Sequence, residues 1–147
     1  MIKLTDEMRA AIDHALADNF PTMWTTVDET GQPNSAFFGS AQVIGDNQIG
    51  IWMKSPARGF LKRIEGNPKV SMLYRNHTTK FGFQVQGEAR RADDDETKRR
   101  VYDAAPEAEQ KGDPDRIGTA VIVDIVRVIQ RGEVVQSRDE LVGTKVD

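Results

Sequence analysis

Apolar and polar residues alternate along several short stretches of the chain, which is the pattern of β-strands buried on one side. The alternation is strictest over residues 80–92, where aromatic and aliphatic residues share one side and Gln84 and Gln86 lie on the other. Residues 119–131 are the most strongly β segment and are apolar on both sides until Arg127, so we expect a strand whose second face is covered by a helix or a second subunit. The other predicted strands span residues 20–27, 34–44, 48–53, 69–75 and 133–136. Short turns join the first three of these, which predicts an antiparallel meander.

Helical spacing of apolar residues is confined to shorter parts of the sequence. We expect a first helix to about residue 17, capped by Thr5 and acidic in its first turn. A second acidic start at residues 93–96 predicts a helix that ends before Pro106. Residues 107–115 are polar and predict a loop with at most one helical turn, and residues 138–147 a loose polar tail.

A third helix is predicted in the middle of the chain, directly after the strand 48–53. Ser55 is a suitable N-cap, because its hydroxyl can accept a hydrogen bond from a free backbone N–H one turn later. Pro56 then fits the first helical position, where an N–H is not needed. Gly66 and Pro68 mark the end of this helix and the approach to the next strand.

The start of this central helix is the strongest candidate binding site in the sequence. A helix N-terminus carries free N–H groups and a partial positive charge. Lys54, Arg58 and the Ser55 hydroxyl would add two cations and a hydrogen-bond donor, which suits a phosphate monoester. On pattern alone, an ordinary crossover helix with solvated basic residues is the simpler interpretation.

Composition narrows the classes of protein to consider. The 147 residues suffice for one domain, which we place at residues 1–147. The net charge of −3 argues against a nucleic-acid binder. The absence of cysteine, of a membrane-length apolar run and of a signal sequence predicts a cytoplasmic protein that does not associate with membranes. Two isolated histidines give no basis for a metal site, and no catalytic acid or nucleophile stands out, as expected where a cofactor supplies the chemistry.

The segment after the central helix reads Asn-Pro-Lys-Val over residues 67–70 and opens a strand. With the strand ending at Ser55 and the basic helix start, this order resembles the signature of the pyridoxamine 5′-phosphate oxidase-like family, the FMN-binding split barrels. The resemblance extends from about Asp6 to Gln136. It implies a mainly β fold, a six- to seven-stranded antiparallel Greek-key split barrel with helices packed outside.

The same resemblance implies a flavoprotein, an oxidoreductase that transfers hydride or electrons at the flavin of FMN to or from an unknown substrate. Phosphate recognition would fall on Lys54, Ser55, Arg58 and the backbone amides of Gly59 and Phe60. The flavin ring would be lined by Ser35, Ala36, Phe37, Phe38, Trp52 and Met53, with a polar contact from Gln84 or Gln86.

A homodimer is expected on two grounds. The resemblance implies FMN in two grooves between subunits. Independently, the two-sided apolar strand over 119–128 and four aromatic residues exceed what one small barrel would bury. These aromatic residues are Phe37, Phe38, Trp52 and Phe60.

The sequence also departs from the true pyridoxamine 5′-phosphate oxidases. Their strand Arg and Lys align with Ala36 and Ala41, and Gly59-Phe60 replaces their adjacent Arg-Lys in the helix. Their C-terminal substrate-binding segment, with Trp and Arg, has no counterpart in this sequence. We therefore do not expect vitamin B6 oxidase activity. Two alternatives stay open: a flavin carrier or stress protein without turnover, and a barrel that holds a deazaflavin, haem or no ligand.

Overall fold

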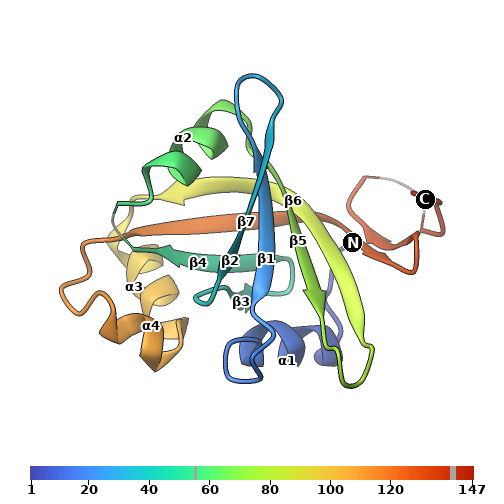
Figure 1. Cartoon of the computed structure of the whole chain (residues 1–147), viewed down its shortest axis with the longest axis horizontal. Coiled ribbons are helices and arrows are strands. Elements are labelled where there is room, and N and C mark those ends of the chain that lie inside the picture. Colours follow the sequence, from blue (N-terminus) through green and yellow to red (C-terminus); the bar gives the residue numbers. More distant parts are fainter. Residues whose placement is uncertain (55, 140–141) are drawn as a thin grey trace.

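The computed structural model describes residues 1–54, 56–139 and 142–147, and its strands form one antiparallel sheet that curves around a core (Figure 1). The strands are β1 (Thr22–Val27), β2 (Pro33–Phe38), β3 (Gln42–Gly45), β4 (Gln48–Met53), β5 (Lys69–Arg75), β6 (Gly82–Ala92), β7 (Thr119–Gln130) and β8 (Glu133–Ser137). The helices are α1 (Asp6–His14), α2 (Arg58–Gly66), α3 (Asp95–Ala104) and α4 (Glu107–Lys111). The mainly β split-barrel prediction is confirmed, with eight strands in place of six or seven.

The strand order is β2-β1-β5-β6-β7-β4-β3, and β8 adds to the free part of β7. The long strand β7 pairs with β6 along one edge, and along its other edge with β4 over residues 119–124 and with β8 over residues 127–130. The edge strands β2 and β3 are joined by residues 39–41.

The predicted single strand 34–44 is wrong, because the structure divides it into β2 and β3. β2 pairs with β1, whereas β3 pairs with β4, so the expected three-stranded meander is two separate hairpins. Ser40 explains the break. Its hydroxyl donates to the Trp52 carbonyl at 2.8 Å and accepts from the Trp52 N–H at 3.1 Å. The Ser40 side chain thereby makes the two hydrogen bonds to the Trp52 backbone that a paired strand would otherwise make.

The core has two parts that lie on opposite sides of β4 and β7. The larger part fills the barrel, is centred on buried residues such as Trp24, Met72 and Val123, and includes the apolar face of α1. The smaller part lies under α3 and contains Trp52 and Ile122. The prediction that both faces of β7 are covered is confirmed for its first part, where α3 of the same chain covers Ala120 and Ile122, whereas Val126 and Arg127 further along are only half-buried.

The chain beyond β8 is more ordered than the predicted loose tail. The N–H of Gly143 donates to the Val134 carbonyl at 2.7 Å, and that of Val146 to the Gly132 carbonyl at 3.0 Å. Residues 142–147 therefore fold back along β8. None of the helices in the described ranges combines the length and apolar content that a membrane crossing needs.

Candidate functional site

The connection from β4 to α2 differs from its prediction. α2 begins at Arg58, with Ala57 in the capping position and no side-chain cap. Ser55 lies outside the described residues, and its assignment as N-cap is wrong because the helix starts three residues later. The Arg58 N–H donates to the Pro56 carbonyl at 2.7 Å, so a tight turn precedes the helix and Pro56 lies before its first turn.

This later start still presents an anion-binding geometry. The first N–H groups of a helix lack intrahelical acceptors, and at the start of α2 no side chain of the described residues accepts from them. Arg58 is now the first helical residue and is exposed. Among the residues that the structure describes, its guanidinium has no hydrogen-bond or ion-pair partner.

Lys54, the other predicted cation, is already paired. Its Nζ lies 3.0 Å from Oε2 of Glu109 on α4. The Lys54 side chain is 45% exposed, whereas that of Glu109 is only 17% exposed. The two cations at the start of α2 therefore differ, because one is neutralised within the chain and the other is not.

The aromatic residues predicted to line a flavin ring are mostly packed inside the chain. Trp52 is 3% exposed and lies edge-on to Tyr102 under α3, with ring centroids 5.0 Å apart. Met53 is buried in the barrel core. Phe60 is also buried and meets the Phe38 ring edge-on at 5.0 Å. Because these side chains are buried, they offer a ligand little surface to contact.

Asp113, which sequence reasoning missed, fixes the position of Trp52. Its carboxylate is buried and accepts from Trp52 Nε1 at 2.9 Å, from the Gly118 N–H at 2.8 Å and from the Ile117 N–H at 3.0 Å. A side chain at Gly118 would come within 2.5 Å of the Met53 carbonyl, so glycine permits this close approach. No local signal marks Asp113, because its partner Trp52 is 61 positions away in the sequence.

Burial by itself raises the pKa of the Asp113 carboxyl. The hydrogen bonds from Trp52, Gly118 and Ile117, with a smaller contribution from the Lys54 charge, outweigh that effect and hold the pKa below its usual value. Asp113 is thus an ionised buried group that ties the loop before β7 to the end of β4.

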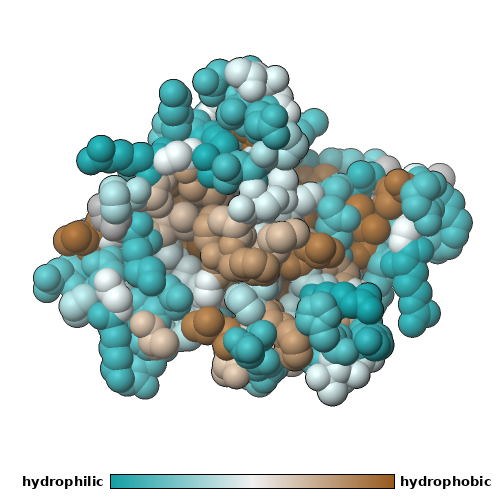
Figure 2. All heavy atoms as spheres, viewed as in Figure 1, coloured by the Kyte–Doolittle hydropathy of each residue, from teal (hydrophilic) through white to brown (hydrophobic). Residues whose placement is uncertain are grey.

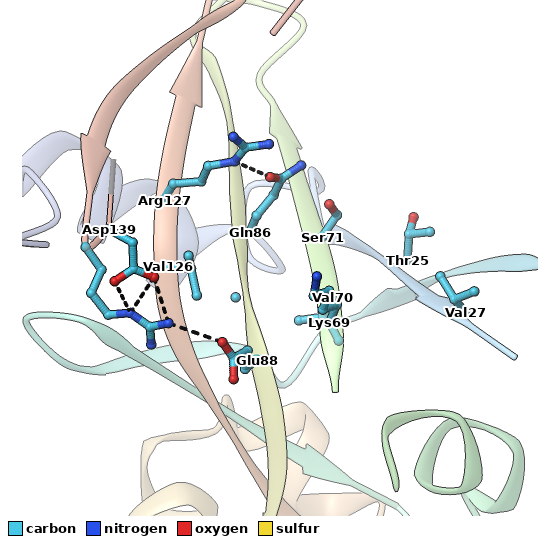
Figure 3. A pocket seen from close by; sticks show the side chains of 12 residues that line it. Thr25, Val27, Lys69, Val70, Ser71, Gln86, Glu88, Val126, Arg127 and Asp139 are labelled. Carbon is cyan, nitrogen blue, oxygen red and sulfur yellow. Dashed lines mark hydrogen bonds and ion pairs between the residues drawn. The ribbon is translucent and has the colours of Figure 1, made fainter. Parts of the chain in front are cut away.

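A polar groove of about 520 Å³ lies on the outer face of the sheet (Figure 3). β1, β5, β6 and β7 form its floor, and Arg138 and Asp139 close one side after β8. Gln86 accepts from Arg127 Nε at 2.6 Å, and Arg138 bridges Glu88 at 3.2 Å and Asp139 at 3.0 Å. The groove thus contains hydrogen-bonding groups and charges of both signs.

The strand register explains why polar residues line up here. Ser35, Thr25, Ser71, Gln86 and Arg127 are successive partners across β2, β1, β5, β6 and β7. The Thr25 and Ser35 hydroxyls are 2.9 Å apart, which continues the row to the sheet edge. This polar row brings together two of the predicted site residues, Ser35 and Gln86.

An apolar row runs beside it on the same face. Phe37, Met23 and Leu73 are register partners across β2, β1 and β5, followed by Gln84 on β6. Phe37 is 68% exposed and Leu73 is 47% exposed. Figure 2 shows apolar atoms gathered near the middle of the face over β1 and β5. Gln84 donates to the Ser71 hydroxyl at 3.1 Å and so connects the two rows.

The predicted site residues therefore fall into three places. Lys54, Arg58 and Gly59 are exposed at the start of α2. The outer face of the sheet holds Ser35, Phe37, Gln84 and Gln86. The packed interior holds Trp52, Met53 and Phe60, whereas Ala36 and Phe38 on β2 are half-buried, with Phe38 packed against the core.

Three comparisons with known proteins place this geometry in context. The family model of pyridoxamine 5′-phosphate oxidase matches residues 4–132. The chain is similar to the solved structure of HupZ from Group A Streptococcus, with 22% identity over 85% of this chain and 91% of that one and a TM-score of 0.66. A comparison with curated proteins gave no match.

Two further solved structures show the same fold. One is an FMN-binding protein from Syntrophomonas wolfei, 18% identical over 84% of this chain and 83% of that one, with a TM-score of 0.66. The other is General Stress Protein 26 from Bacillus anthracis, 17% identical over 83% of this chain and 92% of that one, with a TM-score of 0.60.

Proposed function

Because this chain belongs to the pyridoxamine 5′-phosphate oxidase family, we propose that it binds FMN and acts as a flavin-dependent oxidoreductase. One observation carries the proposal. Among the described residues, no side chain caps the start of α2, and the exposed Arg58 guanidinium at its first residue has no partner. A phosphate monoester satisfies both the free N–H groups and the unpaired cation.

The residues of this chain divide the work of holding FMN. Arg58, Lys54 and the amides of Gly59 and Phe60 bind the phosphate, while buried Trp52 fixes the end of β4 from which this connection starts. Bound flavin supplies the hydride or electron transfer, so the protein has to position the ring and exclude competing reactions. We do not extend this activity to pyridoxamine 5′-phosphate, because Ala36 and Ala41 offer no cation where the true oxidases carry Arg and Lys.

Anaerobic reduction distinguishes an oxidoreductase from a flavin carrier. The FMN-loaded protein is mixed with NADH or NADPH while the visible flavin absorption is followed. Bleaching that is faster than with free FMN supports an oxidoreductase. A flavin that neither donor reduces supports the second candidate, a stress protein or carrier without turnover, which the fold shared with General Stress Protein 26 favours.

We also propose a homodimer, on grounds that differ from those in the sequence. Trp52 and Phe60 are buried within one chain, and α3 covers the second face of β7 at Ala120 and Ile122, so those residues no longer argue for a partner. The exposed apolar row of Phe37, Met23 and Leu73 does argue for a partner, because a contiguous apolar patch on a protein surface usually marks an interaction site. A second copy on this face would close the polar groove beside it and place Gln84 and Gln86 near a flavin held between the copies.

Phe37→Asp should weaken this dimer, because it places a charge at the most exposed position of the apolar row. Light scattering is expected to give about twice the 16.4 kDa chain mass for the parent at micromolar concentration and a smaller mass for the variant. Ile117→Asp is the matched control, since Ile117 is 72% exposed in a different part of the chain. A monomeric parent, or equal masses for the two variants, contradicts the proposed interface.

A further inference from the structure

The Glu109 carboxylate fills a space that is open because the nearby residue 39 is a glycine. Its Oε2 contacts Lys54 Nζ at 3.0 Å, and its Oε1 lies where a side chain at Gly39 would be, 2.5 Å from the position of a Cβ. A Cβ at Gly112 would meet the Lys54 chain at 3.1 Å. Two glycines from different parts of the chain thus leave room for this one ion pair, whose acidic member is largely shielded from solvent.

α4 is held in place without help from Glu109. The Gln110 side-chain amide donates to the Tyr102 carbonyl at 2.9 Å, and the Tyr102 hydroxyl donates to the Gln110 carbonyl at 3.1 Å. The Glu109 side chain can therefore change rotamer while the helix stays where it is. The neighbouring Glu107 faces solvent and pairs with Lys111 along the same helix.

We propose that Glu109 is an internal competitor for the phosphate of the cofactor. In the flavin-free chain it neutralises Lys54, and on binding Lys54 exchanges this carboxylate for the phosphate. The inference rests on the proposed FMN function and specifies how the affinity of that site is limited. A partly exposed pair of this kind is weak, so a dianionic phosphate can displace it. The displaced carboxylate then remains near the phosphate and opposes it by like charge.

The test is Glu109→Gln, which keeps the shape of the side chain and removes its charge. Titration with FMN at low salt should show about 1.5- to fivefold tighter binding than the parent, the range expected from removing one weak competing pair. The gain should shrink at about 1 M salt, where charges are screened over about 3 Å. Riboflavin, which lacks the phosphate, should bind both proteins equally. The matched control is Glu107→Gln on the same helix, which should bind FMN like the parent.

A second variant background tests whether the gain in FMN affinity depends on Lys54. With Lys54→Gln already present, adding Glu109→Gln should gain much less FMN affinity, because the paired cation is gone. Unchanged or weaker FMN binding by Glu109→Gln, with thermal unfolding showing a folded protein, overturns the inference. Equal tightening of FMN and riboflavin also overturns it. If the parent itself binds no FMN, the proposed function fails, which is a different result from a parent that binds and a variant that does not differ.

Discussion

Arg58→Ala is expected to weaken FMN binding by about tenfold to a hundredfold and to leave riboflavin binding nearly unchanged. Hydrogen bonds to charged groups contribute about 1.5–3 kcal/mol, and each 1.4 kcal/mol is about a factor of ten in affinity. The guanidinium can contact a phosphate through two N–H groups, which a lysine ammonium does not do in the same fixed geometry. Riboflavin has no phosphate and therefore no use for this residue.

The structure explains why the effect should concentrate on one residue. Arg58 begins α2 and has no side-chain partner within the described residues, whereas the Lys54 charge is neutralised by Glu109. The strand positions Ala36 and Ala41 add no basic group. The sequence placed Arg58 later in the first turn. Its position as the first helical residue retains it at the positive end of the helix dipole.

Lys62→Ala is the control for this prediction. Lys62 is exposed on the same helix, one turn further from the N-terminus, and should affect FMN binding less. Flavin titration of the parent and both variants, with thermal unfolding to show that each is folded, gives the comparison. An Arg58→Ala protein that binds FMN like the parent, or that loses FMN and riboflavin equally, contradicts the phosphate assignment.

Asp113→Ala is expected to lower the free energy of unfolding by about 3–5 kcal/mol. The substitution removes the acceptor of the buried Trp52 indole N–H and of the part-buried backbone N–H groups of Ile117 and Gly118. Each unsatisfied buried donor costs about 1–3 kcal/mol, with some relief from entering water. Asp113→Asn keeps one carbonyl oxygen as acceptor and should lose less. Urea unfolding measures all three proteins, and an alanine variant as stable as the parent contradicts this account of the loop.

The lowered pKa of Asp113 adds a pH dependence whose sign can be worked out. Burial opposes the shift, but the donors from Trp52, Gly118 and Ile117 favour the ionised form in the folded state. Its contribution to stability is therefore complete above the unfolded pKa, about 3.9, and is lost as pH falls through the lower folded pKa. The stability difference between the parent and Asp113→Asn should narrow as the pH falls below about 4. A difference that stays constant there contradicts this role for the charge.

Strand positions and buried faces were largely predictable, because alternation over β6 and two-sided burial over β7 follow from side-chain geometry. The break between β2 and β3 was not predictable. The apolar pattern continues through it, and the Ser40 hydroxyl replaces the ladder only once β4 lies beside it. The start of α2 was also predicted too early. Ser55-Pro56 is a strong local capping signal, but a turn closed by the Pro56 carbonyl precedes the helix, which begins at Arg58.

The site was predictable where it depends on charge at one helix end, as with Lys54 and Arg58. It was not predictable where distant segments meet. Glu109 and Asp113 lie in a polar stretch that reads as a loop, and only the folded chain brings them to the end of β4. Conversely, Trp52 and Phe60 were predicted to contact a ligand, because aromatic residues suit both cores and flavin sites. In the folded chain, Trp52 packs under α3 and Phe60 packs against Phe38.

The most direct test of the central claim is an equilibrium titration of the flavin-free protein with FMN and with riboflavin, followed by flavin fluorescence. A site organised around a phosphate at the start of α2 should bind FMN at least about tenfold more tightly than riboflavin, since charge-assisted bonds to the phosphate contribute more than about 1.4 kcal/mol. Equal affinities for the two flavins, or no binding of either, would contradict the account.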